Sequence, residues 1–259
     1  RRRLIQSSRL KATPRLSRSL AVLDMASVPG SARGRCVVGC GRGARLDGAV
    51  LGGWARRLVI MVKAPAAGRV KTRLASDIGA VAATQFYRHA SGSLIARLGR
   101  DQRWVTELAI APDTAVRDRQ WPMHLSRRGQ GGGDLGQRMQ AILDRRPPGP
   151  VVIVGSDCPA MQPADIAAAF AALGRADAVF GPSPDGGYWL VGERRSPRPI
   201  KAFADVRWSS DWTLVDTLRN FDGWRVEMLR EIADIDTADD LRDGWAWSNA
   251  GRRVPARGM

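Results

Sequence analysis

The chain has 259 residues, of which 44% are hydrophobic and 25% are charged. This balance is typical of a globular protein and excludes wholesale disorder, and the length suffices for one large domain or two small ones. No run approaches the roughly 18 consecutive apolar residues of a membrane span, so we expect neither a transmembrane helix nor a secretory signal. Three cysteines, Cys36, Cys40 and Cys158, are too few for a disulfide framework and indicate a reducing compartment, the cytoplasm.

The formal net charge of +16 raises the question of a nucleic-acid partner. The excess is concentrated in residues 1–57, which hold 13 Lys or Arg against 2 Asp, a net of +11, whereas residues 58–259 hold 28 against 23, a net of +5. Residues 1–57 lack apolar periodicity, so we expect a basic, disordered leader. This leader has three interpretations: a nucleic-acid-binding arm, a transit peptide, and non-native sequence from an upstream start site. The composition favours the third. We therefore expect no nucleic-acid partner.

From Leu58 onward the sequence alternates between predicted strands and helices. Apolar runs at residues 58–62 and 104–111 predict strands, and Gly99 is expected to end the helix between them in a left-handed conformation. That helix is predicted from apolar residues that recur every four positions, namely Ile78, Ala82, Phe86, Ala90, Leu94 and Leu98. Asp134 is placed to cap the next helix, which Pro147 to Pro150 ends.

The second half continues the alternation. Val151 to Val154, bounded by a proline and by Gly155, is typical of a central strand covered on both faces. Further elements are a helix opened by Pro163 with Ile166, Phe170 and Leu173 aligned, a helix from Ser209 or Ser210 to Asn220, and strands at 178–180, 188–191 and 224–229. The order predicts an α/β fold with a mostly parallel central sheet, over residues 58–247, followed by a flexible basic tail at 248–259.

The loop after the first predicted strand carries a glycine turn at Gly68 and the cations Arg69, Lys71 and Arg73. In an open α/β sheet such a loop faces the ligand crevice, so these groups suit a polyphosphate. The spacing is not that of a Walker loop, because two residues separate Gly68 from Lys71. A basic surface loop without a ligand remains the equal alternative.

Asp157 directly follows the predicted central strand and is expected at the mouth of the crevice. A carboxylate there can bridge a divalent metal to phosphates, although one carboxylate is insufficient, and the alternative is a cap for the following turn. Cys158 is predicted to be a small buried thiol, because no histidine follows in a motif that would activate it.

Two further segments have competing interpretations. The segment Gly181 to Trp189 places Asp185 where it could accept hydrogen bonds from a substrate hydroxyl, but Asp-Gly-Gly between strands is also a hairpin signal, which is slightly favoured. Asp236 reads first as a helix cap and second as a missing metal ligand. The glycine run at 129–133 fails the dinucleotide fingerprint, yet it could wrap a base or ribose edge.

Six motifs together resemble one family. They are Pro65-x-x-Gly68-x-Val70-Lys71-Thr72-Arg73-Leu74, Gly133-Asp134-Leu135-Gly136-x-Arg138-Met139, Gly155-Ser156-Asp157-Cys158-Pro159, Asp185-Gly186-Gly187-Tyr188, Trp208-Ser209 and Asp234-x-Asp236-Thr237-x-x-Asp240-Leu241. Over residues 58–245 the chain resembles the bacterial glycosyltransferase-A-fold family of little-characterised radical-SAM/selenodomain-associated transferases. That family is related to nucleotide-diphospho-sugar transferases and to cofactor-biosynthesis nucleotidyltransferases.

The resemblance implies a Rossmann-like glycosyltransferase-A fold, with helices on both faces of the sheet, that binds a nucleoside di- or triphosphate donor with Mg²⁺ or Mn²⁺. It implies a catalytic role for Lys71, Asp157 and Asp185, and metal binding by Asp157 and Asp236. The implied nucleotide and phosphate contacts are Pro65, Gly68, Lys71, Thr72, Arg73, Gly133 and Gly136. The implied contacts to a small-molecule acceptor are Asp185, Gly186, Gly187, Tyr188 and Trp208.

Two departures from the wider fold leave the reaction open. The usual Asp-x-Asp is here Ser156-Asp157-Cys158, and the nucleotidyltransferase glycine loop with its signature arginine is replaced by Val-Lys-Thr-Arg. We expect a metal-dependent transferase with a nucleotide-activated donor, with sugar transfer as the favoured reaction. The alternatives are nucleotidyl transfer from a nucleoside triphosphate to a phosphorylated small molecule, and a non-catalytic protein that binds nucleotide or nucleic acid.

Overall fold

The computed structural model describes residues 50–51, 54–196 and 200–242. Most of the predicted leader, with Cys36 and Cys40, lies outside these residues, as does the predicted tail at 248–259. The regular structure begins before Leu58: β2 (Trp54–Ala55) pairs with β1 (Val50–Leu51), and β3 starts at Arg57. Within the described ranges, no helix is both long and apolar enough to cross a membrane.

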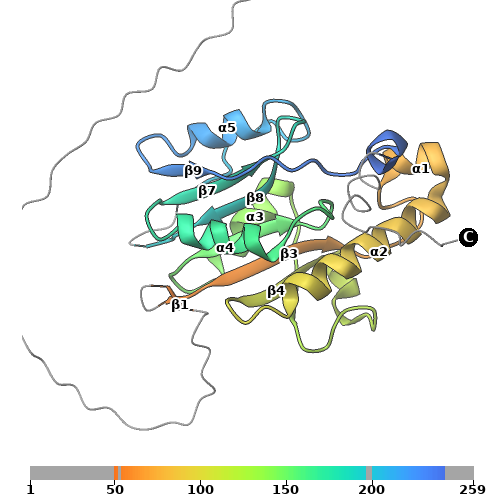
Figure 1. The fold of residues 1–259 in the computed structure, drawn as a ribbon, viewed down its shortest axis with the longest axis horizontal. Helices are drawn as coiled ribbons and strands as arrows, with labels where there is room; N and C mark the ends of the chain where they lie inside the picture. The colour runs from red at the N-terminus through yellow and green to blue at the C-terminus, as the bar shows by residue number, and fades with distance from the viewer. Residues whose placement is uncertain (1–49, 52–53, 197–199, 243–259) are drawn as a thin grey trace, which may run out of the picture. The chain divides into compact units, whose positions relative to one another are not determined.

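A seven-stranded sheet has the order β5-β4-β3-β6-β8-β7-β9 (Figure 1). Its strands are β3 (Arg57–Lys63), β4 (Val105–Ala111), β5 (Ser126–Gly129), β6 (Val151–Gly155), β7 (Ala178–Pro182), β8 (Tyr188–Glu193) and β9 (Val226–Met228). Only β8 runs against its neighbours in this sheet, because a hairpin joins it to β7. The predicted mostly parallel sheet and the predicted hairpin are both confirmed.

Helices cover both faces of the sheet, as predicted. Leu58, Ile60 and Val62 of β3 join one hydrophobic cluster while Val59 joins the other, because successive side chains of a strand point to opposite faces. The first cluster contains buried residues of α2 (Ala80–Gly99) and α4 (Pro163–Ala172), which lie on the near face in Figure 1. The second contains those of α3 (Leu135–Asp144) and contacts α5 (Thr213–Arg219).

The long first helix differs from its prediction. Gly79, with a φ of 88°, separates α1 (Thr72–Ile78) from α2. The predicted four-residue stripe is wrong over its first half, because Ile78 and Ala82 are exposed while Ala83 and Tyr87 are buried. Four residues advance about 400° around a helix, so a strict four-residue repeat drifts off one face by about 40° a step. Gly99 is the last helical residue of α2 and has no left-handed conformation.

The starts of two helices match their predictions. Asp134 caps α3 by accepting a hydrogen bond from the backbone N–H of Gln137 at 2.8 Å, and α4 begins at Pro163. The third differs, because α5 begins at Thr213 and Ser210 instead closes the preceding turn by accepting from the N–H of Trp212 at 3.3 Å. The short 3-10 helix η1 (Asp113–Arg117) and the polar strand β5 were not predicted, since neither has apolar periodicity.

Candidate functional site

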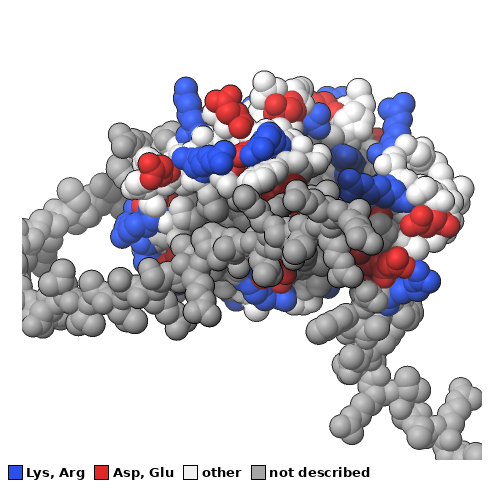
Figure 2. All heavy atoms as spheres, turned by 90° about the horizontal axis from the view of Figure 1, so that it is seen from above, with Lys and Arg blue, Asp and Glu red and all other residues white. Residues whose placement is uncertain are grey.

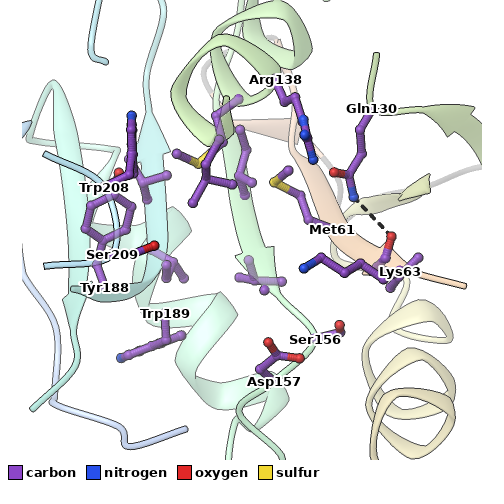
Figure 3. Close-up of a pocket in the computed structure, with 18 of the residues that line it drawn as sticks. Met61, Lys63, Gln130, Arg138, Ser156, Asp157, Tyr188, Trp189, Trp208 and Ser209 are labelled. Atoms are coloured by element: carbon purple, nitrogen blue, oxygen red, sulfur yellow. Dashed lines mark hydrogen bonds between the residues drawn. The ribbon is translucent and has the colours of Figure 1, made fainter. Parts of the chain in front are cut away.

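Two adjoining cavities lie at the carboxyl ends of the parallel strands, where open α/β sheets place their ligands. The sheet cavity has a volume of about 470 Å³, and its polar and aromatic lining includes Tyr87, Gln130, Ser156, Asp157, Tyr188 and Trp208 (Figure 3). The loop cavity, of about 640 Å³, is lined by Ala64, Ala66, Arg69, Ala111, Pro112, Asp113, Gly131 and Gly132. Lys63 and Arg138 line both, so the two cavities form one crevice.

The loop between β3 and α1 places Lys71 beside Asp157, at the edge of the sheet cavity, although Lys71 itself lines neither cavity. The buried side chains of Val70 and Leu74 anchor its end, and Gly68 turns the chain with a φ of 73°. Lys71 itself adopts φ 47° and ψ 52°, a left-handed conformation that costs a non-glycine residue on the order of 1 kcal/mol or more. Such a conformation persists only where the surrounding structure determines it, and here the surroundings are carboxylates.

The Lys71 ammonium lies between two predicted metal ligands. Its Nζ donates a hydrogen bond to Asp236 Oδ1 at 2.7 Å and is 3.5 Å from Asp157 Oδ2, and its side chain is only 4% exposed. Burial alone would lower the pKa of Lys71, but the carboxylates of Asp157, Asp236 and Asp234 together raise it above its usual value. Lys71 is therefore a fixed cation in this site.

Four aspartates cluster here, and we call Asp157, Asp185, Asp234 and Asp236 the acidic wall. All of them except Asp185 act on the charge of Lys71, and Asp185 acts on Asp234. Burial, together with the charges of the other three aspartates and against the opposing effect of Lys71, raises the pKa of Asp234 to about 6. The helix-capping role predicted for Asp236 belongs instead to Thr237 and Asp240, since Asp240 Oδ2 accepts hydrogen bonds from the N–H groups of residues 236 and 237. The Asp236 carboxylate is thereby left to face Lys71.

The acidic wall suits a metal that is completed by a substrate. The structure, over its described residues, holds no group of three or more His, Cys, Asp or Glu side chains arranged around a metal position. Mg²⁺ is commonly held by one or two carboxylates together with substrate phosphates and water. Asp157 and Asp236 have side chains that are 48% and 35% exposed, and Asp157 lines the sheet cavity, whereas Asp236 is reached from its edge. The donor set fits a divalent metal whose remaining ligands are phosphate oxygens and water.

A second group of side chains has the opposite charge to the acidic wall. We call Lys63, Arg69 and Arg138 the cationic wall. None of these three side chains has a carboxylate partner among the described residues, and Arg138 only donates its Nε–H to the carbonyl of Gly133 at 2.8 Å. Elsewhere arginines are commonly paired, as Arg207 is with Asp216, and on the face in Figure 2 basic and acidic side chains are interspersed. Unpaired cations gathered in one crevice indicate an anionic ligand.

Hydroxyl and amide groups that sequence reasoning missed complete the sheet cavity. The Tyr87 hydroxyl accepts a hydrogen bond from the backbone N–H of Lys63 at 2.9 Å and shares another with Ser156 Oγ at 2.9 Å. Gln130 follows β5 and bridges β3 and β4. Lys63 could have been found, because it directly follows a predicted strand. Tyr87 and Gln130 had no such signal, because their partners are distant in the sequence.

Several glycines of the predicted site have roles in packing. Gly136 was expected to contact phosphate, but a Cβ there would lie 2.5 Å from the ring of Trp208, so this glycine admits that ring against α3. Gly186, with a φ of 79°, lets the hairpin turn approach the backbone of Asp211 closely. Gly133 also has a positive φ, of 92°, and lies before the capping box of α3.

The other predicted residues fall into two groups. Tyr188 and Trp208 line the sheet cavity, and Asp185 lies in the turn after β7, where it accepts a hydrogen bond from the N–H of Gly187 at 3.0 Å. Pro65, Thr72 and Arg73 line neither cavity in this conformation, although Arg73, whose side chain is 75% exposed, lies 3.5 Å from Asp236.

Cys158 is not a nucleophile in this structure. Its side chain is buried and free, as predicted, and burial raises the pKa of its thiol far above the usual range. A thiol that stays protonated cannot attack a substrate at neutral pH.

Comparisons with known proteins were made with this geometry in hand. A family model described as "Uncharacterized protein conserved in bacteria (DUF2064)" matches residues 94–210. This span contains Asp157, Asp185 and Trp208, but it includes neither Lys71 nor Asp236. No curated protein sequence matched the chain.

Solved structures resemble the chain over about three quarters of its length. One, from Desulfovibrio desulfuricans, is provisionally described as a nucleotide-diphospho-sugar transferase and has 28% identity, a TM-score of 0.65, and coverage of 76% of this chain and 88% of its own. A mycobacterial homologue of Rv0371c has 14% identity, a TM-score of 0.50, and coverage of 76% and 98%. The 4-diphosphocytidyl-2C-methyl-D-erythritol synthase of Anaerococcus prevotii has 12% identity, a TM-score of 0.50, and coverage of 75% and 98%. These likenesses confirm the predicted fold class.

Proposed function

We propose that this protein is a metal-dependent transferase that uses a nucleotide-activated donor, and that the group it transfers is a sugar. The observation that carries the proposal is that the unpaired cationic wall and the acidic wall around Lys71 meet at the sheet cavity, which Lys63, Arg138 and Asp157 line together. Phosphate oxygens pair with cations, and a divalent metal bridges phosphates to carboxylates. A metal-bound nucleoside diphosphate matches both walls. The 28% identical structure described as a nucleotide-diphospho-sugar transferase supports sugar as the transferred group.

The residues of the two walls have different tasks in this proposal. Lys63, Arg69 and Arg138 pair with the phosphate oxygens of the donor. Asp157 and Asp236 would hold Mg²⁺ or Mn²⁺, which when bound neutralises charge that develops on the leaving phosphate oxygens. Lys71 keeps a permanent positive charge beside these oxygens, because its neighbours raise its pKa.

In this proposal the acceptor binds in the sheet cavity, which Tyr188 and Trp208 line. Its hydroxyl oxygen forms a bond to the anomeric carbon of the donor sugar while the bond from that carbon to the diphosphate oxygen breaks. The nucleoside diphosphate leaves with the electron pair, and Asp185 takes the proton of the attacking hydroxyl. Only one oxygen of Asp185 is engaged by Gly187, so the other is free for this proton.

The test is a thermal-denaturation screen of the full chain against nucleotide sugars and nucleoside triphosphates, with and without Mg²⁺ or Mn²⁺. A ligand at 100 times its Kd stabilises the folded state by about 2.7 kcal/mol, which such a screen detects. We expect the largest shift with a nucleotide sugar plus metal. Incubation of that pair with candidate acceptors should then release the nucleoside diphosphate.

The other outcomes contradict the proposal in distinct ways. A shift with triphosphates alone, followed by pyrophosphate release in the presence of a phosphorylated small molecule, would replace sugar transfer with nucleotidyl transfer. Metal-dependent binding without turnover of any acceptor would indicate a nucleotide sensor. No shift across the panel would contradict the nucleotide site itself, and RNA binding by the full chain would then favour the nucleic-acid interpretation.

A further inference from the structure

Gln130 presents a fixed hydrogen-bond acceptor to the sheet cavity. The residue is 4% exposed, and its side-chain Nε2 donates to the carbonyl oxygens of Val62 at 3.0 Å and Ala109 at 2.9 Å. Both amide hydrogens are therefore used by the ends of β3 and β4. Because a carbonyl oxygen can only accept, the amide cannot be turned around in this position.

The remaining atom of that amide has no partner. Gln130 Oε1 makes no hydrogen bond with any described residue, and it is not among the buried polar atoms cut off from solvent. Figure 3 shows this oxygen turned toward the cavity, in the part of the lining that also holds Arg138, Met61 and Lys63. A neutral acceptor held rigidly beside two cations selects a ligand that brings an O–H or N–H donor next to its anionic group.

We propose that Gln130 accepts a hydrogen bond from a ribose hydroxyl of the donor nucleotide and makes the site selective for ribonucleotides over their deoxy forms. This inference rests on the proposed function, in which Lys63 and Arg138 hold the phosphates. Phosphate oxygens are themselves acceptors and cannot bond to Gln130 Oε1. Ribose is joined directly to the phosphate and carries hydroxyl donors, so it comes within reach of this oxygen before the base does. The transferred sugar is the other neighbour of the phosphates, and a nucleoside diphosphate, which lacks it, tests ribose alone.

The expected discrimination follows from the cost of an unpaired acceptor. A deoxy analogue enters the same cavity, displaces water from Gln130 Oε1 and offers no hydrogen in return. Sites built to bond a substrate hydroxyl reject the analogue that lacks it. We expect a Kd about 10 to 100 times weaker for the 2′-deoxy or the 3′-deoxy form of a nucleoside diphosphate than for the ribonucleotide.

The experiment is calorimetric titration of the full chain with uridine and guanosine diphosphates and with their 2′-deoxy and 3′-deoxy forms, all with Mg²⁺. Gln130→Met should reduce the ribo-to-deoxy ratio to about 1. That ratio is the readout, because loss of the bonds to Val62 and Ala109 can weaken all ligands equally. Gln140→Met is the matched control, since this amide bonds within the protein and lines neither cavity. It should keep the wild-type ratio.

Failure of this inference is distinguishable from failure of the proposed function. If no diphosphate binds, the proposed function falls, and the inference falls with it. If ribonucleotides bind and both deoxy forms bind equally well, nucleotide binding stands and the role of Gln130 is overturned. Discrimination that persists in Gln130→Met would likewise overturn it, as would a ratio that depends on the base and not on the sugar.

Discussion

The two walls of the crevice differ in how their charges are satisfied. Lys63, Arg69 and Arg138 face the crevice with no carboxylate partner in the described part of the chain. The acidic wall instead encloses its own cation, since Lys71 lies 2.7 Å from Asp236 and 3.5 Å from Asp157. The cationic wall is thus complementary to an anion as it stands, whereas Lys71 already neutralises part of the charge of the acidic wall.

This difference indicates how the site is stabilised without its ligand. Burial and the repulsion among four neighbouring carboxylates together raise the pKa of Asp234 to about 6. The Lys71 ammonium reduces that repulsion in the free protein. When phosphates and a divalent metal bind together, the phosphates can pair with the cationic wall and the metal with the acidic wall. Substitutions in the two walls should therefore have separable effects.

The largest effect is expected from removing both predicted metal ligands. The double variant Asp157→Asn and Asp236→Asn should lower turnover by about 10³ or more, since it removes the charge that holds the metal against the phosphates. Titration with Mn²⁺ in the presence of nucleotide should show the loss of metal binding directly. Asp239→Asn is the control, because its side chain is 81% exposed and pairs only with Arg242. Unchanged turnover in the double variant would contradict the metal role.

Lys71→Ala should lower turnover by about 10² to 10³, comparable to the loss of a preorganised charge stabiliser. In the nucleotide-free protein, however, the same variant should bind Mn²⁺ more tightly than wild type, because the cation between Asp157 and Asp236 is gone. Calorimetry measures the second effect and steady-state kinetics the first. Lys201→Ala, an exposed lysine that lines neither cavity, should change neither quantity. Wild-type kinetics in Lys71→Ala would rule out its phosphate role.

Arg138→Ala should weaken nucleotide binding by about tenfold and leave the metal dependence intact, because an accessible cation contributes on the order of 1 kcal/mol. The nucleotide Kd should also become less sensitive to salt. Fluorescence titration at two ionic strengths tests both expectations. Arg88→Ala, on the exposed face of α2, should behave as wild type. Equal losses in the two arginine variants would mean that only the overall charge matters.

The smallest effect on turnover is expected at Glu193, which pairs with Val151 at the opposite end of the sheet. Burial raises the pKa of Glu193 to about 7 from 4.5, and its Oε1 has no partner among the described residues. The folded state therefore binds more protons, so wild-type stability falls as the pH rises from about 4.5 to 7.

Glu193→Gln removes this penalty and should raise the free energy of unfolding at pH 8 by about 3 kcal/mol, with little change at pH 4.5 and none in turnover. Denaturant unfolding at the two pH values measures it. Glu231→Gln, at an exposed position, should have no effect at either pH. A pH-independent difference for Glu193→Gln would show that the carboxyl does not titrate as described.

The sequence predicted the fold well where local signals are strong. The apolar run of β6, the capping residue Asp134 and the proline at the start of α4 each determine their element through neighbours in the chain. Only part of the buried face of α2 was predicted correctly, because apolar residues at a fixed spacing do not show which side of the helix packs on the sheet. Ala83 and Tyr87 are buried there by tertiary contacts.

Some residues of the site were predicted from the sequence and others were not, for a related reason. Family motifs named Lys71, Asp157 and Asp236, and the fold brings these residues together across 165 positions of the chain. Gln130 lies in the run at 129–133 that was interpreted as able to wrap a base or ribose edge, but its side chain was not singled out. Its position depends on two backbone carbonyls, 21 and 68 residues away, which no sequence pattern indicates. The motif glycine Gly136 permits a close approach to Trp208 of its own chain, and its contact with phosphate stays a prediction.

The most direct test of the two-wall account is the Kd of one nucleoside diphosphate sugar, measured with Mg²⁺ and with EDTA, in wild type, in Arg138→Ala and in the double Asp157→Asn and Asp236→Asn variant. The account predicts that Mg²⁺ tightens binding about tenfold or more in wild type and in Arg138→Ala, and has no effect in the double variant. Equal affinities with Mg²⁺ and with EDTA in the wild-type protein would contradict it.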